Sequence, residues 1–317
     1  MGLMEEATIA ECSEEELSTP ARLPLPPRFV LGKIPIDRIT MDYAAVLMVE
    51  ALLHRGELPP LMVVGPNAHL VTMAERDERF AEAMRDADLV VPDGVSVLLA
   101  SRLLGVPVPE RVTGGDLMER MCAEAAHYGF RVFFLGGLPG AAVMAAHRLR
   151  ATYPGLNVCG TYYPPTGFER DAAELGRIQK AIEEAAPDLL CVAFGAPRQE
   201  IWIQQNRSRL NVGAIMAVGA ALDTQAGLRR RAPVWVREMA LEWLFRLAME
   251  PRRLWRRYLI GNTRFVLLVI RQWMHERLDE LKRGIRERIG TSGNAFSGPE
   301  QGPGHEKDRG TAHQFVQ

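Results

Sequence analysis

The sequence predicts an α/β fold that is doubly wound around a mostly parallel sheet and is followed by a basic helical appendage. Short, apolar, β-branched segments alternate with longer helix-type segments between residues 61 and 218. Strands are apolar along their whole length when helices cover both faces of a parallel sheet. The alternation stops after Gly227, where arginine and tryptophan become frequent. Alternating strands and helices of this kind are typical of Rossmann-like domains.

The individual elements follow from local signals. Phe29–Ile36 is predicted to be a first strand, and Thr40 is expected to cap a helix over Met41–His54 that ends near Gly56. The strands of the parallel sheet are predicted at Leu61–Val64, Asp88–Val91, Arg131–Leu135, Leu156–Gly160, Asp188–Phe194 and Gly213–Val218. Helices are predicted to begin after Pro66-Asn67, after Pro92-Asp93-Gly94, after Gly136–Gly140, at about Arg170 and after Gly195–Glu200.

Composition divides the chain into four parts. Residues 1–27, acidic and then proline-rich, and residues 290–317, rich in Gly and Ser, are predicted to be disordered. Residues 28–227 are the predicted Rossmann-like core, and residues 228–289 are the predicted appendage. The appendage is expected to hold three helices, over Val234–Met249, from Pro251 in a first turn, and over Thr263–Arg288.

The composition also argues against several classes of protein. The first residues lack the basic and apolar regions of a signal peptide, and the longest apolar run near the end, Phe265–Ile270, is far too short to span a membrane. The cysteines Cys122, Cys159 and Cys191 lie in apolar segments without CxxC spacing, which indicates reduced thiols in a reducing compartment. The histidines form no HxH or HxxxH pair, so no metal site and no cofactor are predicted.

The candidate site residues follow the predicted strands directly. Ligands of an open parallel sheet bind beyond the carboxyl ends of its strands. The residues found at these positions are Asn67, Asp93, Gly136 with Gly137, and Gln199 with Glu200.

Each candidate also has a purely structural interpretation. Asp93 would serve as a general base or as a helix N-cap, and the cap is the more common use of such an aspartate. Asn67 follows a proline, where a turn role is common. The Gly136–Gly140 turn either presents backbone N–H groups to a phosphate or is a tight turn without a ligand. For Gln199 and Glu200 the same two alternatives remain open.

Two other patterns are assigned structural roles. Asp86 and Asp88 resemble a metal-binding DxD pair, but they precede their strand, so helix-end and turn roles are expected. His69 is expected to be a helix-face histidine without a chemical role.

The appendage is strongly basic. Residues 227–288 contain 16 Lys and Arg against 7 Asp and Glu, a net charge of +9 in a chain whose total is −1. Such a segment seeks an anion: a nucleic acid, an anionic membrane surface or a phosphate-bearing substrate. No nucleic-acid reader motif is present, whereas arginine interleaved with tryptophan is typical of helices at anionic membranes.

An ordered set of motifs extends over residues 30–275. It consists of PNAHL from Pro66, ADLVVPDGVSVLLASRLLG from Ala87, RVTGGDL from Arg111, FFLGGLPG from Phe133, FGAPRQE from Phe194, VGAALDTQAGLRRRAPVW from Val218 and LEWLFRLAMEPRRLWRRYL from Leu241. With this set the chain resembles the WecG/TagA/CpsF glycosyltransferases of bacteria (glycosyltransferase family 26), which act in the cytoplasm at the inner face of the cell membrane.

The resemblance implies a reaction and the residues that perform it. Family members transfer a sugar from a UDP-sugar to a polyprenyl-diphosphate-linked saccharide, with inversion and without a metal. N-acetylmannosamine is the sugar of the best-known members, and others act in exopolysaccharide assembly with hexose donors. The resemblance implies that Asp93 is the general base and that Asn67 and Gln199 line the sugar and acceptor site. Asp223 matches the family's aspartate after the last strand and is predicted to bind substrate. Arg246, Arg253 and Arg256 match catalytic arginines of a C-terminal appendage that folds over the active site and touches the membrane.

Three departures from the family pattern bear on the identity of the transferred sugar more than on the type of reaction. Gly65 stands where the family usually has threonine, and Ala220–Leu222 replaces the usual Gly-Phe pair before the aspartate. The loop Tyr162–Phe168 resembles a subset tied to exopolysaccharide clusters. The sugar is therefore left open between N-acetylmannosamine and a hexose.

The sequence is also compatible with two functions other than glycosyl transfer. One is a dinucleotide-dependent oxidoreductase, against which the absence of GxGxxG counts. The other is a non-catalytic polysaccharide-assembly or membrane-binding module. Homo-oligomerisation is left open.

Overall fold

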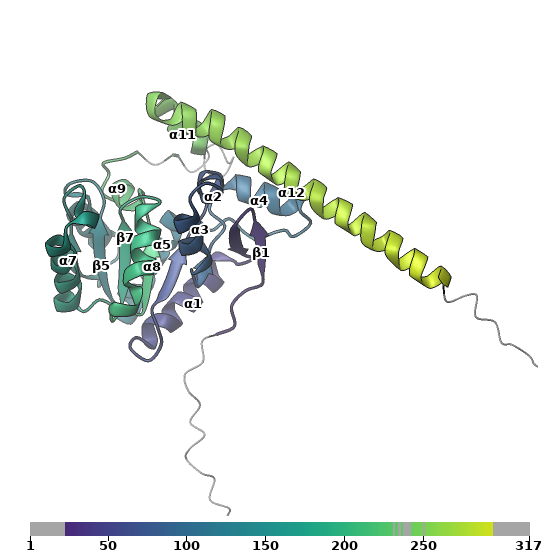
Figure 1. The fold of residues 1–317 in the computed structure, drawn as a ribbon. Helices are drawn as coiled ribbons and strands as arrows, with labels where there is room; N and C mark the ends of the chain where they lie inside the picture. The colour runs from purple at the N-terminus through teal and green to yellow at the C-terminus, as the bar shows by residue number, and fades with distance from the viewer. Residues whose placement is uncertain (1–22, 231, 234–235, 237–241, 250, 294–317) are drawn as a thin grey trace, which may run out of the picture. The chain divides into compact units, whose positions relative to one another are not determined.

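The computed structural model describes residues 23–230, 232–233, 236, 242–249 and 251–293. The side chains of residues 242–243, 246, 251–260 and 284–293 lie outside this description. Six strands form one sheet in the order β4-β3-β8-β7-β5-β6, and each neighbouring pair is parallel. Helices cover both faces of this sheet (Figure 1). The predicted doubly wound α/β fold is confirmed.

The predicted strands of the sheet are all found, within two residues at each end. They are β3 (Leu61–Val64), β4 (Leu89–Val90), β5 (Arg131–Gly136), β6 (Asn157–Tyr162), β7 (Leu189–Ala193) and β8 (Ala214–Ala217). The core helices are α1 (Met41–Leu53), α2 (Ala68–Ala74), α3 (Glu78–Arg85), α4 (Val95–Leu103), α5 (Gly114–Tyr128), α6 (Ala141–Thr152), α7 (Ala172–Ala185), α8 (Arg198–Asn206) and α9 (Ala221–Gln225).

Two apolar layers hold these helices against the sheet. One contains side chains of α1, α5, α6 and α9, and the other contains side chains of α2, α3, α7 and α8. Strand β5 supplies both, because successive side chains of a strand point to opposite faces. Val132 and Phe134 pack in the first layer, whereas Phe133 and Leu135 pack in the second.

The first predicted strand is wrong. Phe29–Ile36 is not one strand but an antiparallel hairpin of β1 (Arg28–Leu31) and β2 (Ile34–Asp37). The chain reverses at Gly32, whose φ of +61° lies in the left-handed region that glycine tolerates. An apolar run shows strand character but does not reveal a reversal within it.

The hairpin is fastened to the edge of the large sheet by one buried carboxylate. Asp37 accepts hydrogen bonds from Arg28 Nε and from the backbone N–H of Val90 in β4, both at 2.6 Å. Arg28 also donates to Ala87 O at 3.2 Å. Burial raises the pKa of Asp37, and the bonds from Arg28 and Val90 oppose that rise. Strand β4 has only two residues, so this contact supports the strand that leads to Asp93.

The predicted break within the appendage is also wrong. The expected helices from Pro251 and over Thr263–Arg288 form one helix, α12 (Pro251–Gly293), of 43 residues. An isolated glycine such as Gly261 costs a helix only about 1 kcal/mol, which the many leucine and arginine residues of the same helix outweigh. Upstream, the structure describes α11 (Glu242–Met249) within the predicted Val234–Met249 helix, and most of the rest of that span lies outside the described residues.

The chain divides into two compact units after Gln272. Within the first unit, Phe265 and Val269 of α12 pack in the second apolar layer. Gln272 accepts from Gly32 N at 3.1 Å and donates to Val30 O at 2.8 Å. The predicted disordered ends fall mostly on residues 1–22 and 294–317, which lie outside the described residues. The predicted boundary between core and appendage at residue 227 stays a prediction.

Gly213 allows helix α1 to approach the sheet closely. A Cβ at this position would lie 2.5 Å from Ala51 O and 2.7 Å from Leu52 Cα, both in the backbone of α1. Gly176 in α7 is the opposite case, because a Cβ there would meet nothing within 4 Å.

We expect Gly213→Ala to lower the free energy of unfolding by about 1–3 kcal/mol, because the backbone of α1 must move to admit the methyl group. Gly176→Ala is the matched control and should raise the same quantity by up to about 1 kcal/mol, since alanine favours the helix. Urea unfolding followed by circular dichroism measures both values. Equal stability of the two variants would contradict the close packing at Gly213.

Candidate functional site

All the sequence-predicted core residues lie at one edge of the sheet. Parallel strands end at the same edge, and the polar residues come directly after them. Asn67 follows β3, Asp93 follows β4, Gly136 and Gly137 end β5, Gln199 and Glu200 follow β7, and Asp223 follows β8. The strand order places the loops after β8 and β7 between those of β3 and β5.

The structure places Asp93 one residue before the start of α4. The N-cap of α4 is Gly94, with φ +111°, so Asp93 is not the N-cap residue itself. Asp93 instead lies beside the end of β3. A Cβ on Gly65 would be 3.3 Å from Asp93 Cβ and 3.7 Å from Asp93 Oδ2. The side chain of Asp93 is half-buried, which leaves it reachable from the strand-end edge.

Asn67 stands next to the same loop. A Cβ on Gly94 would lie 3.5 Å from Asn67 Cβ, so β3 and β4 bring Asn67 close to Asp93. The Oδ1 atom of Asn67 caps α2 by accepting from the backbone N–H of His69 at 3.1 Å and of Leu70 at 3.4 Å. The turn role considered for Asn67 takes the form of a helix N-cap, and this cap fixes which end of the amide faces away from the helix.

The Gly136–Gly140 loop is shaped by its glycines. A Cβ on Gly136, whose φ is +96°, would lie 2.9 Å from Ala193 O and from the Phe194 ring. Only glycine fits that space. Gly140 is the N-cap of α6 and supplies no side-chain cap. The N–H groups of Gly137 and Ala141 already donate to Ala193 O and Leu138 O. The first N–H groups of a helix have no partner within it, so the candidate donors for an anion are those that follow Ala141 at the start of α6.

Asp223 ties this loop to the beginning of the basic segment. It is 5% exposed, and its Oδ1 accepts from Leu138 N at 2.8 Å. Its Oδ2 forms an ion pair with Arg229 Nε at 3.1 Å. The backbone carbonyl of Asp223 also accepts from Leu228 N and Arg229 N. The carboxylate predicted to bind substrate is therefore occupied in holding two segments together.

Gln199 has a comparable role between β7 and β8. It is 5% exposed, and its Oε1 accepts from Gly195 N and from Gly219 N, each at 3.1 Å. Its Nε2 donates to Glu200 Oε1 at 2.8 Å. The amide therefore connects the loop after β7 to the loop after β8.

Glu200 is the most strongly perturbed acid in the site. It is 1% exposed, and its Oε2 has no hydrogen-bond partner within the described part of the chain. Burial raises the pKa of Glu200 to about 7, with the hydrogen bond from Gln199 opposing the rise. Buried carboxyls with raised pKa values concentrate at functional sites.

Sequence reasoning gave no structural role to the Thr113–Asp116 segment. Thr113 caps α5 by accepting from Asp116 N at 3.1 Å. A Cβ on Gly114 would lie 3.7 Å from Ala217 O, and one on Gly115 would lie 3.7 Å from Ala221 Cβ. The start of α5 therefore packs against the end of β8 and the start of α9. The Thr-Gly-Gly-Asp pattern, a cap followed by two residues without side chains, was the available signal.

Comparison with known proteins decides the family. The model of the glycosyl transferase WecG/TagA/CpsF family matches residues 29–279. The N-acetylglucosaminyldiphosphoundecaprenol N-acetyl-beta-D-mannosaminyltransferase of Bacillus spizizenii is 29% identical over 215 residues, which are 68% of this chain and 79% of the relative. The protein of the same name from Staphylococcus aureus strain MW2 is 30% identical over 197 residues, which are 62% of this chain and 75% of the relative. The chain belongs to the WecG/TagA/CpsF family of glycosyltransferases.

Family membership confirms the resemblance and the predicted enzyme class. It replaces both alternatives, the dinucleotide-dependent oxidoreductase and the non-catalytic module. The match also extends into α12, so part of the basic appendage belongs to the family's common chain.

The three appendage arginines of this glycosyltransferase remain predictions. Arg246 lies in α11, and Arg253 and Arg256 lie in α12. Their side chains are outside the described residues, so the structure does not test whether they reach the strand-end edge.

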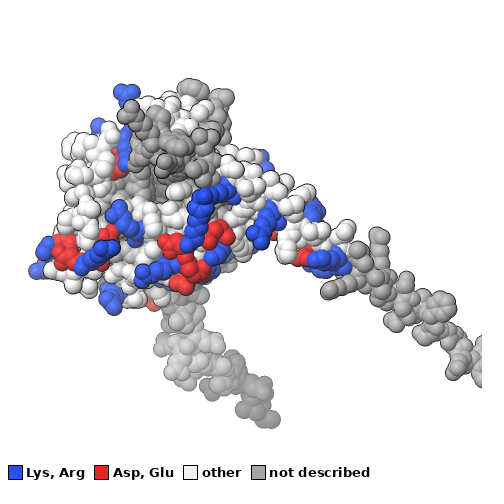
Figure 2. Space-filling model, turned by 45° about the horizontal axis from the view of Figure 1, so that its top comes forward, with Lys and Arg blue, Asp and Glu red and all other residues white. Residues whose placement is uncertain are grey.

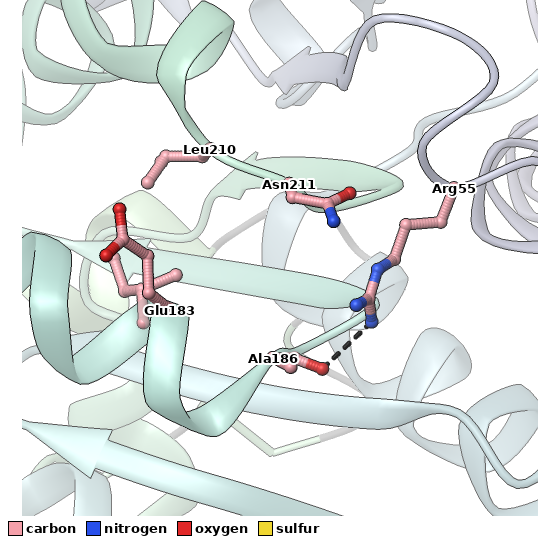
Figure 3. Close-up of a pocket in the computed structure, with 6 residues that line it drawn as sticks. Arg55, Glu183, Ala186, Leu210 and Asn211 are labelled. Atoms are coloured by element: carbon pink, nitrogen blue, oxygen red, sulfur yellow. Dashed lines mark hydrogen bonds between the residues drawn. The ribbon is translucent and has the colours of Figure 1, made fainter.

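Two further features are the Asp86 and Asp88 pair, considered as possible metal ligands, and one surface pocket. Asp86 is the C-cap of α3, and Asp88 accepts from Met62 N and Arg207 Nη1, so the predicted structural roles of this pair are confirmed. Among the described residues, no three His, Cys, Asp or Glu side chains are grouped as metal ligands would be. A shallow pocket beside Arg55 lies where β7 and β8 begin, at the other end of the strands, and Arg55 donates to Ala186 O there (Figure 3). It is not part of the strand-end site.

The raised pKa of Glu200 makes a prediction about stability. Between about pH 4.5 and pH 7 the folded chain keeps a proton that the unfolded chain releases, so the free energy of unfolding falls as pH rises through this window. Glu200→Gln removes this titration. From pH 5 to pH 8, we expect the variant to gain up to about 3 kcal/mol of stability relative to the wild type. Urea unfolding at both pH values measures the difference, and parallel pH dependences would contradict the assignment.

Proposed function

We propose that this glycosyltransferase moves a sugar, N-acetylmannosamine or a hexose, from a UDP-sugar to a polyprenyl-diphosphate-linked saccharide during cell-surface polysaccharide synthesis. We propose further that the transfer inverts the anomeric centre, needs no metal, and takes place at the inner face of the cell membrane. The observation that carries the proposal is the position of Asp93. Asp93 precedes the N-cap residue of α4 and lies beside Gly65, with Asn67 next to the same loop, at the edge where such sheets bind ligands.

The relatives support the choice of substrates. Their names describe transfer of an N-acetyl-β-mannosaminyl group to N-acetylglucosaminyldiphosphoundecaprenol. A single displacement on an α-linked sugar nucleotide yields a β-linked product. Such a displacement needs one base to activate the acceptor hydroxyl, on the face opposite the leaving group. Asp93 is assigned that role, and Asn67 is assigned to the sugar.

The sheet has room for an extended sugar nucleotide. Four inter-strand spacings separate β4 from β5, a distance of about 19 Å. We assign the sugar to the β4 and β3 end, near Asp93 and Asn67. The nucleotide end is assigned to the Gly136–Gly140 loop and the start of α6. The diphosphate then crosses the loops after β8 and β7, which Gln199 holds together.

The departing UDP gains negative charge as the bond to the sugar breaks. Fixed cations and backbone donors stabilise such charge when they are already in place. We assign the stabilisation of this charge by cations to Arg246, Arg253 and Arg256. Arginine guanidinium groups stay protonated and form bidentate hydrogen bonds to phosphate. This assignment makes a metal ion unnecessary.

Gly65 bears on the identity of the sugar. A Cβ there would be 3.3 Å from Asp93 Cβ and 3.4 Å from Val91 Cγ2. A threonine, usual in the family at this position, would fill the space beside the carboxylate. The glycine removes that side chain and its hydroxyl from beside Asp93, which changes the contacts available to the sugar.

The segment of α12 beyond the core suits a membrane surface. Leu267, Ile270, Met274, Leu278 and Leu281 are all exposed, and their spacing of three and four residues places them on one side of the helix. Phe265 and Val269, which pack on the core, lie on the opposite side. Arg271, Arg277 and Lys282 border the apolar stripe in helical spacing.

The charges on α12 favour an anionic bilayer over a second copy of the helix. In a helix pair formed through this stripe, basic residues would face basic residues. An apolar stripe with basic borders instead matches acyl chains beneath anionic headgroups. On the face of the molecule in Figure 2, acidic and basic side chains of the described core are intermixed. Among the described residues, none of the helices combines the length and apolarity needed to cross a bilayer.

The direct test is transfer from a panel of UDP-sugars to a polyprenyl-diphosphate-linked acceptor, assayed with EDTA. We expect one sugar to be consumed in EDTA, and Asp93→Asn to lower the rate at least about 10²-fold because the base is lost. UDP binding by calorimetry should be nearly unchanged. Asp86→Asn, at the end of α3, is the matched control and should keep full activity. Full activity of Asp93→Asn would refute the base, and a strict metal requirement would refute metal independence.

A second prediction concerns the membrane. Leu278→Glu combined with Leu281→Glu should reduce sedimentation with anionic vesicles at least 10-fold, because each acidic side chain must be buried or repelled. Val46→Glu with Leu53→Glu, two equally exposed positions of α1, adds the same charge elsewhere and should bind like the wild type. If both double variants bind equally well, α12 is not the docking surface.

A further inference from the structure

The buried amide of Gln199 is a shared anchor for two loops. Its Oε1 accepts from Gly195 N, in the loop after β7, and from Gly219 N, in the loop after β8, each at 3.1 Å. These residues are 24 positions apart in the sequence. Their strands lie side by side in the middle of the sheet, so the anchor sets how the two loops lie relative to each other.

The orientation of this amide depends on Glu200. The Nε2 group of Gln199 donates to Glu200 Oε1 at 2.8 Å. If the amide were flipped, its NH₂ group would face two backbone donors and its oxygen would face a carboxyl oxygen. Those contacts pair donors with donors and acceptors with acceptors. Glu200 therefore selects the orientation in which one oxygen serves both loops.

Glu200 is a costly means of orienting an amide. Its side chain is 1% exposed, and Oε2 has no partner in the described part of the chain. A buried carboxyl with an unsatisfied oxygen destabilises a fold. Elsewhere the chain satisfies such a group: buried Glu174 accepts from Tyr162 Oη at 2.7 Å and pairs with Arg177. Persistence of the unsatisfied acid at the strand-end edge indicates a role there.

We propose that Glu200 is a positioning residue: it orients the Gln199 amide so that the loops after β7 and β8 form a fixed floor for the diphosphate of the sugar donor. The proposal rests on the proposed function for what lies on that floor. It also changes the role of Gln199, whose oxygen serves the two loops and not the sugar.

The role has a specific kinetic consequence. A donor whose diphosphate lies on a displaced floor presents its anomeric carbon out of line with the acceptor hydroxyl, and small displacements of this kind cost large factors in rate. The acceptor binds elsewhere, at the Asp93 side. Loss of the contact between Glu200 and the Gln199 amide should therefore raise the donor KM and lower kcat while leaving the acceptor KM unchanged.

Three variants test the hydrogen-bond pattern. Glu200→Leu removes the acceptor and should lower kcat about 10- to 100-fold per folded molecule. Glu200→Gln retains an oxygen that can accept from Gln199 Nε2, so its kcat should stay within about 3-fold of the wild type. Glu174→Leu removes the other buried glutamate named above and is the control for general destabilisation. It should lower the melting temperature without changing the donor KM.

A double substitution separates positioning from direct contact with substrate. Gln199→Glu alone puts two carboxyl groups face to face and should lose at least 10-fold in kcat. Adding Glu200→Gln restores every bond with the polarity exchanged, because the carboxylate at position 199 accepts from both loops and from the new amide. We expect this double variant to recover at least a third of wild-type kcat.

Each outcome decides the proposal. Recovery in the double variant supports it, since the original amide is no longer present to touch the sugar. A folded double variant without recovery would show that the Gln199 amide contacts substrate directly, and would overturn it. Loss of activity in Glu200→Gln equal to that in Glu200→Leu would also overturn it, because a charge would then be required. Wild-type protein that transfers no sugar at all would instead refute the proposed function.

Discussion

The common direction of the six strands is the constraint on which the site depends. Every strand ends at the same edge, so short loops from distant parts of the chain meet there. The strands are only two to six residues long, and little sheet supports each loop. Asp93 and Asn67 come together because β3 pairs with β4, not because they are near in sequence. The candidate site residues are therefore distributed over loops that the sheet brings together.

Buried polar side chains connect these loops to one another and to the sheet. Asp37 binds the hairpin to β4, Gln199 joins the loops after β7 and β8, and Asp223 joins the loop after β5 to the segment after α9. Each satisfies backbone N–H groups that a loop would otherwise leave to water. Such contacts are also selective, because a buried carbonyl or carboxylate oxygen accepts only where donors converge. The site edge is held by buried side chains: Asp37, Gln199 and Asp223 are each 5% exposed or less.

The sequence predicts more of the fold than of the site. Leu61–Val64 and Arg131–Leu135 are recognised because both faces of a parallel strand are apolar, which is a local property. The reversal at Gly32 and the continuity of α12 through Gly261 are not, since both depend on tertiary contacts or on energies summed over a long helix. The same division applies within the site. That Asn67 caps a helix is local, whereas the partners of Gln199 lie four and twenty residues away and appear only when β7 and β8 are adjacent.

The basic charge of the chain is concentrated in the appendage, which the proposed function connects both to catalysis and to the membrane surface. The described core holds Asp93, the proposed base, and the cations assigned in the proposed function to the leaving diphosphate lie in α11 and α12. Asp223 connects the two parts, since one carboxylate oxygen holds Leu138 N of the Gly136–Gly140 loop and the other holds Arg229 at the root of the basic segment. A displacement of that root would be felt at the loop through a single buried group. In the proposed function, the same appendage therefore carries both the cations for the leaving diphosphate and the apolar stripe of α12 that is proposed to meet the membrane.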